Sequence, residues 1–141
     1  MSSELRVNVL RGSTANGNIT IQGEGASNLG GATMQLQQGL AKMHCVIDQT
    51  STQSIVGSFN LSSISDGGTA KTTKTMTNAM SDTTYTISGS GRLDTGGNAC
   101  IHNQDKDITK TASVFGVYHI RQDGSVSDTA ASMSVVHGDL A

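Results

Sequence analysis

The chain has 141 residues, of which 35% are hydrophobic, 3% aromatic and 14% charged, and its formal net charge is −2. This length accommodates one domain with an additional arm. Lys and Arg are scattered and form no clustered positive face, so we expect no nucleic-acid partner. No apolar run approaches the ~20 residues that span a bilayer, and the first residues lack the apolar region of a signal peptide. We therefore expect no membrane insertion and an origin in a cytoplasm.

Large aromatic side chains, which dominate most protein cores, are scarce: the chain has two Phe, two Tyr and no Trp. A single copy is therefore short of apolar burial for its length. We expect subunits to share a core in a homo-oligomer. A small monomer of marginal stability is the alternative.

Residues 1–38 form a predicted N-terminal arm. Apolar and polar residues alternate at 5–10 and 18–22, which favours strands, and Asn16 followed by Gly17 is a strong hairpin signal. Residues 34–38 fit either one helical turn or an extended segment. We expect the arm to pack against copies of itself or other proteins, with a disordered tail as the alternative.

Residues 39–141 read as strands at intervals of roughly 8–12 residues, separated by Gly, Asn and Asp turns. This pattern predicts an all-β, antiparallel, jelly-roll-like β-sandwich. Residues 54–64 read as one strand that Gly57 interrupts with a bulge. Residues 69–77 alternate Lys and Thr, which is typical of a solvent-facing edge strand.

Residues 113–121 form the most apolar predicted strand, and both of its faces are apolar. Phe115 and Val117 lie on one face, and Tyr118 and Ile120 lie on the other. An antiparallel sandwich usually exposes one face of each sheet to solvent. The second apolar face therefore predicts an oligomer interface.

Cys45 and Cys100 are the two cysteines. Neither belongs to a Cys-x-x-Cys motif, and both fall in strand-like runs, where a buried free thiol is the ordinary interpretation. An intracellular origin also argues against a disulfide bond.

Residues for catalysis or metal binding are poorly grouped. The best cluster places His102 near Asp105 and Asp107, but a solvated polar loop explains it, and the local ligand pairs of zinc sites are absent. The two Glu residues, Glu4 and Glu24, lie in the arm, so a glycosidase pair would need two Asp residues. We expect no enzyme, no cofactor and no metal, with glycan depolymerisation as a remote alternative.

Recognition by loops on a rigid sandwich is the more plausible activity. Tyr85 and Tyr118 have rings that can stack on a sugar, although a core role is the simpler expectation for both. The candidate receptor-contact residues are Arg92, Asp94, Asn98, Asn103, Asp105, Asp107, Gln122 and Asp123.

Several segments occur together in an order that resembles one family. They are Ser58-Phe-Asn-Leu-Ser-Ser-Ile-Ser-Asp66, Ala79-Met80, Tyr85 after a short loop, and Val135-Val-His-Gly-Asp139. The order is similar to that of a C-terminal module in tail-fibre proteins of bacteriophages, especially marine and cyanobacterial ones. The family often has Trp where this chain has Met43-His44, and Pro where it has Ser81.

The resemblance, joined to the scarcity of aromatic residues, implies a homotrimeric virion protein, a tail fibre or similar appendage, that contributes to host attachment and is assembled in the host cytoplasm. Residues 1–38 would then contact other virion proteins. Residues 39–141 would face a host-surface glycan or protein. A non-receptor adaptor or a head-decoration protein is the alternative.

Overall fold

The computed structural model describes residues 20–21, 34–35, 39–94 and 100–141. The chain divides into two units, Met1–Leu40 and Ala41–Ala141. In the first unit β1 (Thr20–Ile21) pairs antiparallel with β2 (Met34–Gln35), so the ambiguous segment at 34–35 is extended. The strand expected at 5–10 and the hairpin at 16–17 lie outside the described residues. Among those described, no helix is long and apolar enough to cross a membrane.

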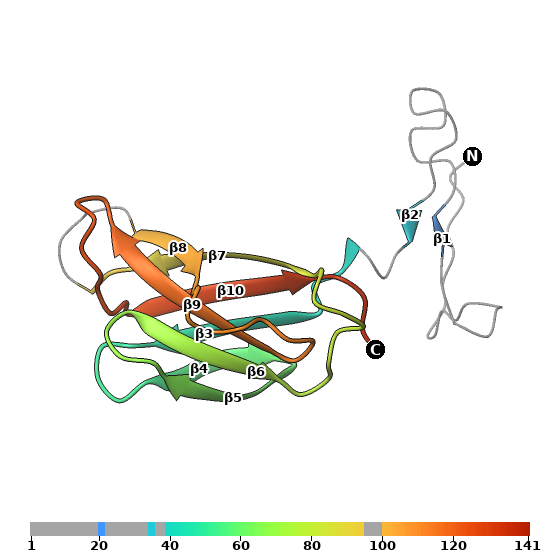
Figure 1. Cartoon of the computed structure of the whole chain (residues 1–141), viewed down its shortest axis with the longest axis horizontal. Coiled ribbons are helices and arrows are strands. Elements are labelled where there is room, and N and C mark those ends of the chain that lie inside the picture. The colour runs from blue at the N-terminus through green and yellow to red at the C-terminus, as the bar shows by residue number, and fades with distance from the viewer. Residues whose placement is uncertain (1–19, 22–33, 36–38, 95–99) are drawn as a thin grey trace, which may run out of the picture. The chain divides into compact units, whose positions relative to one another are not determined.

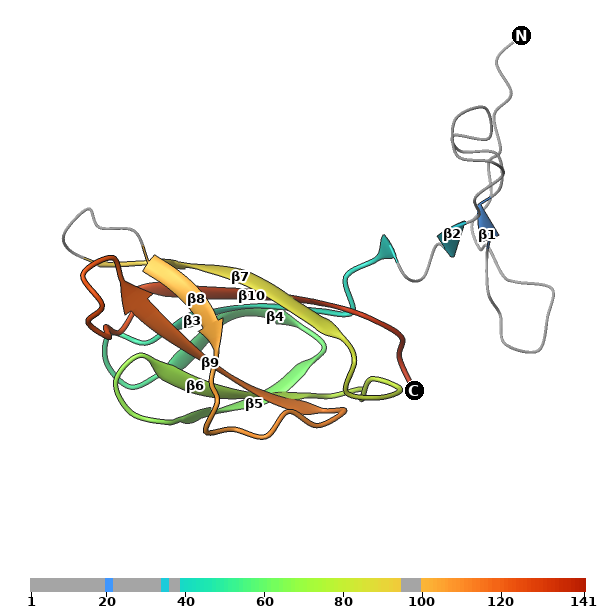
Figure 2. The same cartoon turned by 45° about the horizontal axis from the view of Figure 1, so that its top comes forward.

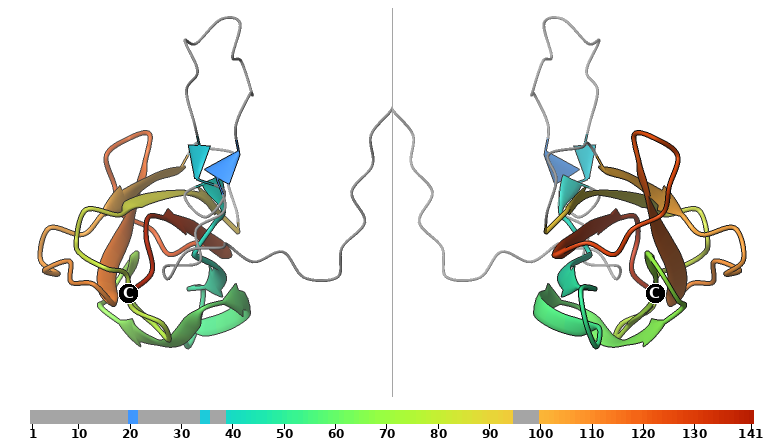
Figure 3. Two further views of the ribbon diagram at one scale, coloured as in Figure 1. Left: turned by 90° about the vertical axis from the view of Figure 1, so that its right-hand side faces the viewer. Right: turned by 90° about the vertical axis from the view of Figure 1, so that its left-hand side faces the viewer.

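The second unit is a sandwich of two antiparallel four-stranded sheets (Figures 1 and 2). Sheet I has the order β4-β3-β10-β7, and sheet II has the order β5-β6-β9-β8. The all-β sandwich predicted from the turn spacing is thereby confirmed. Figure 3 views the unit from its two ends. The strands are β3 (Met43–Asp48), β4 (Ser54–Phe59), β5 (Leu61–Asp66), β6 (Lys71–Met76), β7 (Thr86–Arg92), β8 (Cys100–Gln104), β9 (Val114–Arg121) and β10 (Ala131–His137).

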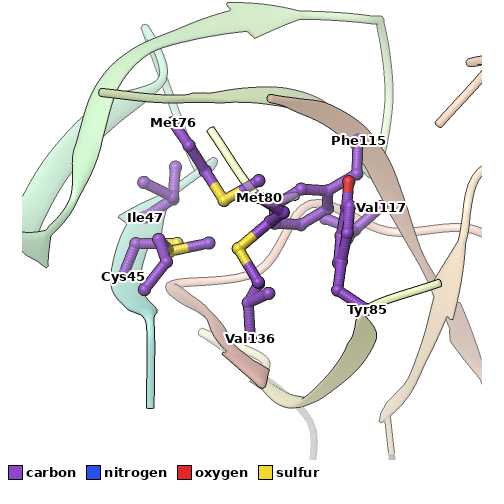
Figure 4. Packing of buried hydrophobic residues seen from close by; sticks show 9 residues of the cluster. Cys45, Ile47, Met76, Met80, Tyr85, Phe115, Val117 and Val136 are labelled. Atoms are coloured by element: carbon purple, nitrogen blue, oxygen red, sulfur yellow. The ribbon is translucent and has the colours of Figure 1, made fainter. Parts of the chain in front are cut away.

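Flexible sulfur-containing side chains replace the missing aromatic residues in the core (Figure 4). Tyr85 meets Phe115 edge to face, with ring centroids 6.3 Å apart. Thioether side chains adapt to irregular gaps, so the methionines fill the space that additional aromatic rings would otherwise occupy. The buried cluster consists of Met43, Cys45, Ile47, Met76, Met80, Tyr85, Phe115, Val117 and Val136. Both cysteines are free thiols, as expected.

The single strand expected at 54–64 is wrong, because the chain turns at Asn60 and passes from sheet I to sheet II. Asn60 has a φ of 56°, a left-handed conformation that Asn tolerates better than most residues. Its side-chain oxygen accepts a hydrogen bond from the backbone N–H of Asn78 at 2.7 Å, and its amide donates to the carbonyl of Lys42 at 2.9 Å. The irregularity expected at Gly57 is present beside it, between Val46 and Ile47 of the paired strand.

The solvent-facing edge strand expected at 69–77 is also wrong. β6 lies between β5 and β9, and Thr72, Lys74 and Met76 are buried. A Lys-Thr alternation reads as solvated from composition alone. Here a hydroxyl group of sheet I accepts a hydrogen bond from the buried amine: Lys74 Nζ donates to Ser134 Oγ at 2.7 Å.

Candidate functional site

A polar and aromatic row crosses the outer face of sheet II. Tyr118 of β9 is in register with Lys71 of β6 on one side and with Asn103 of β8 on the other. Side chains alternate along a strand, and the neighbours Val117 and His119 are buried in the sandwich. The row Lys71–Tyr118–Asn103 therefore faces outward.

The segment after β8 folds back over this face. The Asp105 N–H donates to the Gly116 carbonyl at 2.9 Å. A Cβ on Gly116 would lie 2.7 Å from Ile108 and 3.0 Å from Asp105, so the close approach requires glycine. Lys71 Nζ then reaches Asp107 Oδ2 at 2.7 Å and Asp105 Oδ2 at 3.5 Å.

These ion pairs leave the site close to charge balance. Hydrogen bonds from Lys106 and Lys71 lower the pKa of Asp107 to about 2. The hydrogen bond with Asp107 raises the pKa of Lys71. Asp107 is therefore ionised at neutral pH and held by hydrogen bonds from Lys71 and Lys106.

Aliphatic side chains extend the outer face beyond Tyr118. Two residues beyond Tyr118 on the same face, Ile120 of β9 is in register with Ile101 of β8. Val126 forms an isolated β-bridge with Ile120. Ile101 is 53% exposed and Val126 is 51% exposed. Within the described part of the chain, the Tyr118 hydroxyl has no hydrogen-bond partner. We call the set Lys71, Asn103, Asp105, Asp107 and Tyr118 the Tyr118 site.

The structure brings three of the predicted contact residues together at the Tyr118 site: Asn103, Asp105 and Asp107. Asn103 belongs to strand β8 and not to the expected loop. Asp105 is buried and accepts a hydrogen bond from the Asp107 N–H at 3.0 Å, so Asp107 is the exposed carboxylate of the pair. Lys71 was not among the predicted contact residues, because residues 69–77 were expected to form a solvent-facing edge strand, whereas β6 lies between β5 and β9.

The other predicted contact residues lie where strands end. Arg92 closes β7 and Asp94 follows it, whereas Gln122 and Asp123 follow β9. The Asp123 carboxylate accepts hydrogen bonds from the Ser125 hydroxyl and N–H, which lower its pKa. The Asp123 carboxylate therefore stabilises the turn that contains it. The remaining candidate, at position 98, lies outside the described residues.

Only one of the two tyrosines is available for recognition. Tyr85 is buried, as the simpler expectation had it, and its hydroxyl donates to the Thr111 carbonyl at 2.8 Å. Burial raises the pKa of Tyr85 to about 12. Tyr118 is half-buried on the outer face, so the expected core role is wrong for this residue.

The His102 side chain, which the sequence groups with Asp105 and Asp107, points instead into the sandwich interior. Its Nδ1 lies 3.1 Å from His119 Nε2, and its Nε2 lies 3.4 Å from Ser134 Oγ. Gly89 and Gly91 of β7 make room for these rings, since a Cβ on Gly89 would lie 2.8 Å from His102 Nε2. β7 and β8 consequently lie side by side and close this side of the sandwich (Figures 1 and 2).

This interior cluster is too enclosed for catalysis. Lys74 and His119 have no exposed surface, so a substrate has no access to them. Among the described residues, no group of three His, Cys, Asp or Glu side chains is placed to hold a metal ion. The Tyr118 site is therefore the stronger candidate.

Comparison with known proteins yields one structural likeness. No family model matches the sequence, and no curated protein matches it. The fold is similar to that of part of the phiAB6 tailspike, solved in complex with oligosaccharides of Acinetobacter baumannii surface polysaccharide. The TM-score is 0.55 at 12% identity, over 99% of this chain and 30% of that chain. The likeness concerns the fold, and this chain corresponds to less than a third of the tailspike.

Proposed function

We propose that this chain is a part of a bacteriophage tail appendage and binds host-surface carbohydrate through the Tyr118 site. The observation that carries the proposal is a half-exposed tyrosine in register with an amide and a lysine, next to a fixed carboxylate. The fold shared with a tailspike and the sequence resemblance to marine and cyanobacterial phage tail fibres support the setting.

The chemistry of the Tyr118 site fits a sugar ring. An aromatic ring offers a flat apolar face with a polar tip, on which the C–H face of a sugar can stack. Asn103 supplies an amide that both donates and accepts, and Asp107 accepts hydrogen bonds from sugar hydroxyls. The charge balance of the site favours a neutral sugar over a strongly acidic one.

A single site of this size would bind weakly, since few side chains contact the ligand. Display on several linked copies raises the effective concentration of the second contact and strengthens attachment without new interactions. The homotrimer that the family resemblance implies would provide such a display, with the predicted arm at 1–38 bound to other virion proteins.

Glycan cleavage fits the Tyr118 site less well than binding. Glycosidases pair a general acid of raised pKa with a second carboxylate. Asp107 instead has a pKa of about 2, so it carries no proton to donate at neutral pH. We therefore assign recognition and not catalysis to this pair of aspartates.

Binding of the purified full chain to a panel of bacterial surface polysaccharides tests the proposal. Tyr118→Ala should weaken binding at least about fivefold, because it removes the stacking surface, worth of the order of 1 kcal/mol or more. Leu140→Ala is the matched control, since Leu140 is an exposed apolar residue outside both sheets. Equal loss in both variants, or no binding to any polysaccharide, would contradict the proposal.

A further inference from the structure

One side of the sandwich is open and uncharged. β4 and β5 are consecutive strands, and each is the edge strand of its own sheet. From residue 49 to residue 65 the sequence contains no Asp, Glu, Lys, Arg or His. We call the surface formed by residues 54–65, which are β4 and β5 up to the Asp66 that ends β5, the uncharged side. The opposite side, by contrast, is closed where β7 lies against β8.

The uncharged side also exposes apolar side chains. Val56 is 67% exposed, Phe59 is 55% exposed and Ile55 is 42% exposed. They are three of the seven large hydrophobic residues exposed in the described chain. A monomer that remains free in water rarely gathers such residues on one edge.

Edge strands usually carry protection against pairing with another chain. Lysine, proline, inward-pointing charges and bulges are the common devices. β4, with the sequence Ser-Ile-Val-Gly-Ser-Phe, has only the bulge next to Gly57. The outer edge of β4 can therefore contact another polypeptide chain.

We propose that the uncharged side is the surface on which a second copy of this chain packs. Identical charged surfaces repel each other, whereas two copies of an uncharged, apolar surface meet without that cost. A charged partner would gain no ion pair here. The same side of each copy can face a common symmetry axis, which is compatible with the homo-oligomer expected from composition.

This contact is separate from the Tyr118 site, and it does not use the outer face of residues 113–121, on which the sequence predicted an oligomer interface. Tyr118 lies on β9, and β6 separates that strand from β5. Copies that meet through β4 and β5 leave the outer face around β8 and β9 accessible. Self-association and carbohydrate binding can therefore fail independently of each other.

The test is the molar mass of the full chain in solution, measured by light scattering over a dilution series. We expect the wild type to exceed one subunit and Val56→Lys to have the mass of one subunit. Val126→Lys is the matched control, because Val126 is a similarly exposed valine on sheet II, and it should assemble like the wild type.

A milder variant guards against misfolding. Val56→Ser adds no charge and should shift the concentration of half-assembly upward at least tenfold, with an unchanged far-ultraviolet spectrum. A wild type of single-subunit mass at all concentrations would overturn the proposal. Unaltered assembly of Val56→Lys, or equal loss in Val126→Lys, would overturn it as well.

Discussion

Acid should destabilise this sandwich well above the pH at which its carboxylates titrate. His102 and His119 share one hydrogen bond, which requires a bare nitrogen on one ring. The arrangement that satisfies most groups has His119 Nε2–H donating to His102 Nδ1, and His102 Nε2–H donating to Ser134 Oγ. His119 Nδ1 then remains as an acceptor with no partner. A proton added to either ring would place a buried charge beside Lys74.

The size of the effect follows from the two pKa values. Burial, then the His119 ring and Lys74, lower the pKa of His102 from 6.5 to about 3. Burial and then Lys74 lower the pKa of His119 from 6.5 to about 4. The folded state therefore binds fewer protons than the unfolded state below pH 6.5, and stability falls as the pH falls. At pH 5, about 1.5 units below the unfolded pKa, each ring costs about 2 kcal/mol, or about 4 kcal/mol together.

Urea unfolding of the full chain at pH 8, 7, 6 and 5 measures this loss. We expect no change between pH 8 and 7 and a steep fall between pH 6 and 5. The double variant His102→Gln/His119→Gln should show a much smaller difference between pH 7 and 5, whatever its absolute stability. His44→Gln, at an exposed histidine, should keep the wild-type slope. A flat wild-type profile between pH 7 and 5 would refute the reasoning.

Three further predictions concern the fold and the site. Gly89→Ala should lower the free energy of unfolding by about 2–3 kcal/mol in urea titrations, because its Cβ meets the backbone of β10 and a histidine ring. Gly57→Ala, whose Cβ has nothing within 4 Å, should change it by less than about 0.5 kcal/mol, and equal effects would count against the packing described. Asn60→Ala should cost about 1–2 kcal/mol by thermal unfolding, through lost hydrogen bonds and a strained φ, whereas Asn60→Gly should cost less. Lys71→Met should raise the pKa of Asp107 from about 2 in a carboxyl NMR titration, although not to 3.8, since a second lysine remains bonded to it; an unchanged pKa would show that Lys71 does not hold Asp107.

Strands with a regular apolar period could be predicted from the sequence alone. β3 alternates, so the buried face with Met43 and Cys45 follows from its sequence. β9 is recognisable as a strand, but it is apolar on both faces, and the structure shows that Phe115 and Val117 are on the buried one. β6 could not be predicted in this way, because its interior partner is polar. The buried Lys74 depends on hydroxyl groups of β10, which are distant in the sequence.

The Tyr118 site was predictable only in part, and for a related reason. Asn103, Asp105 and Asp107 lie within one short segment, and a local reading of polar residues finds them. Lys71 comes from a strand that is 36 residues away from Asp107. Lys71 reaches the site only because β6 pairs with β9 and β9 pairs with β8. Local composition does not predict this pairing.

The two tyrosines of the chain allow the most direct test of carbohydrate recognition at the Tyr118 site. The measurement is an NMR titration of the tyrosine-labelled full chain with oligosaccharides from the surface polysaccharide that binds best. The account predicts that the Tyr118 ring resonances shift with saturation, while those of the buried Tyr85 stay in place. Saturable binding that leaves the Tyr118 resonances unmoved would contradict it.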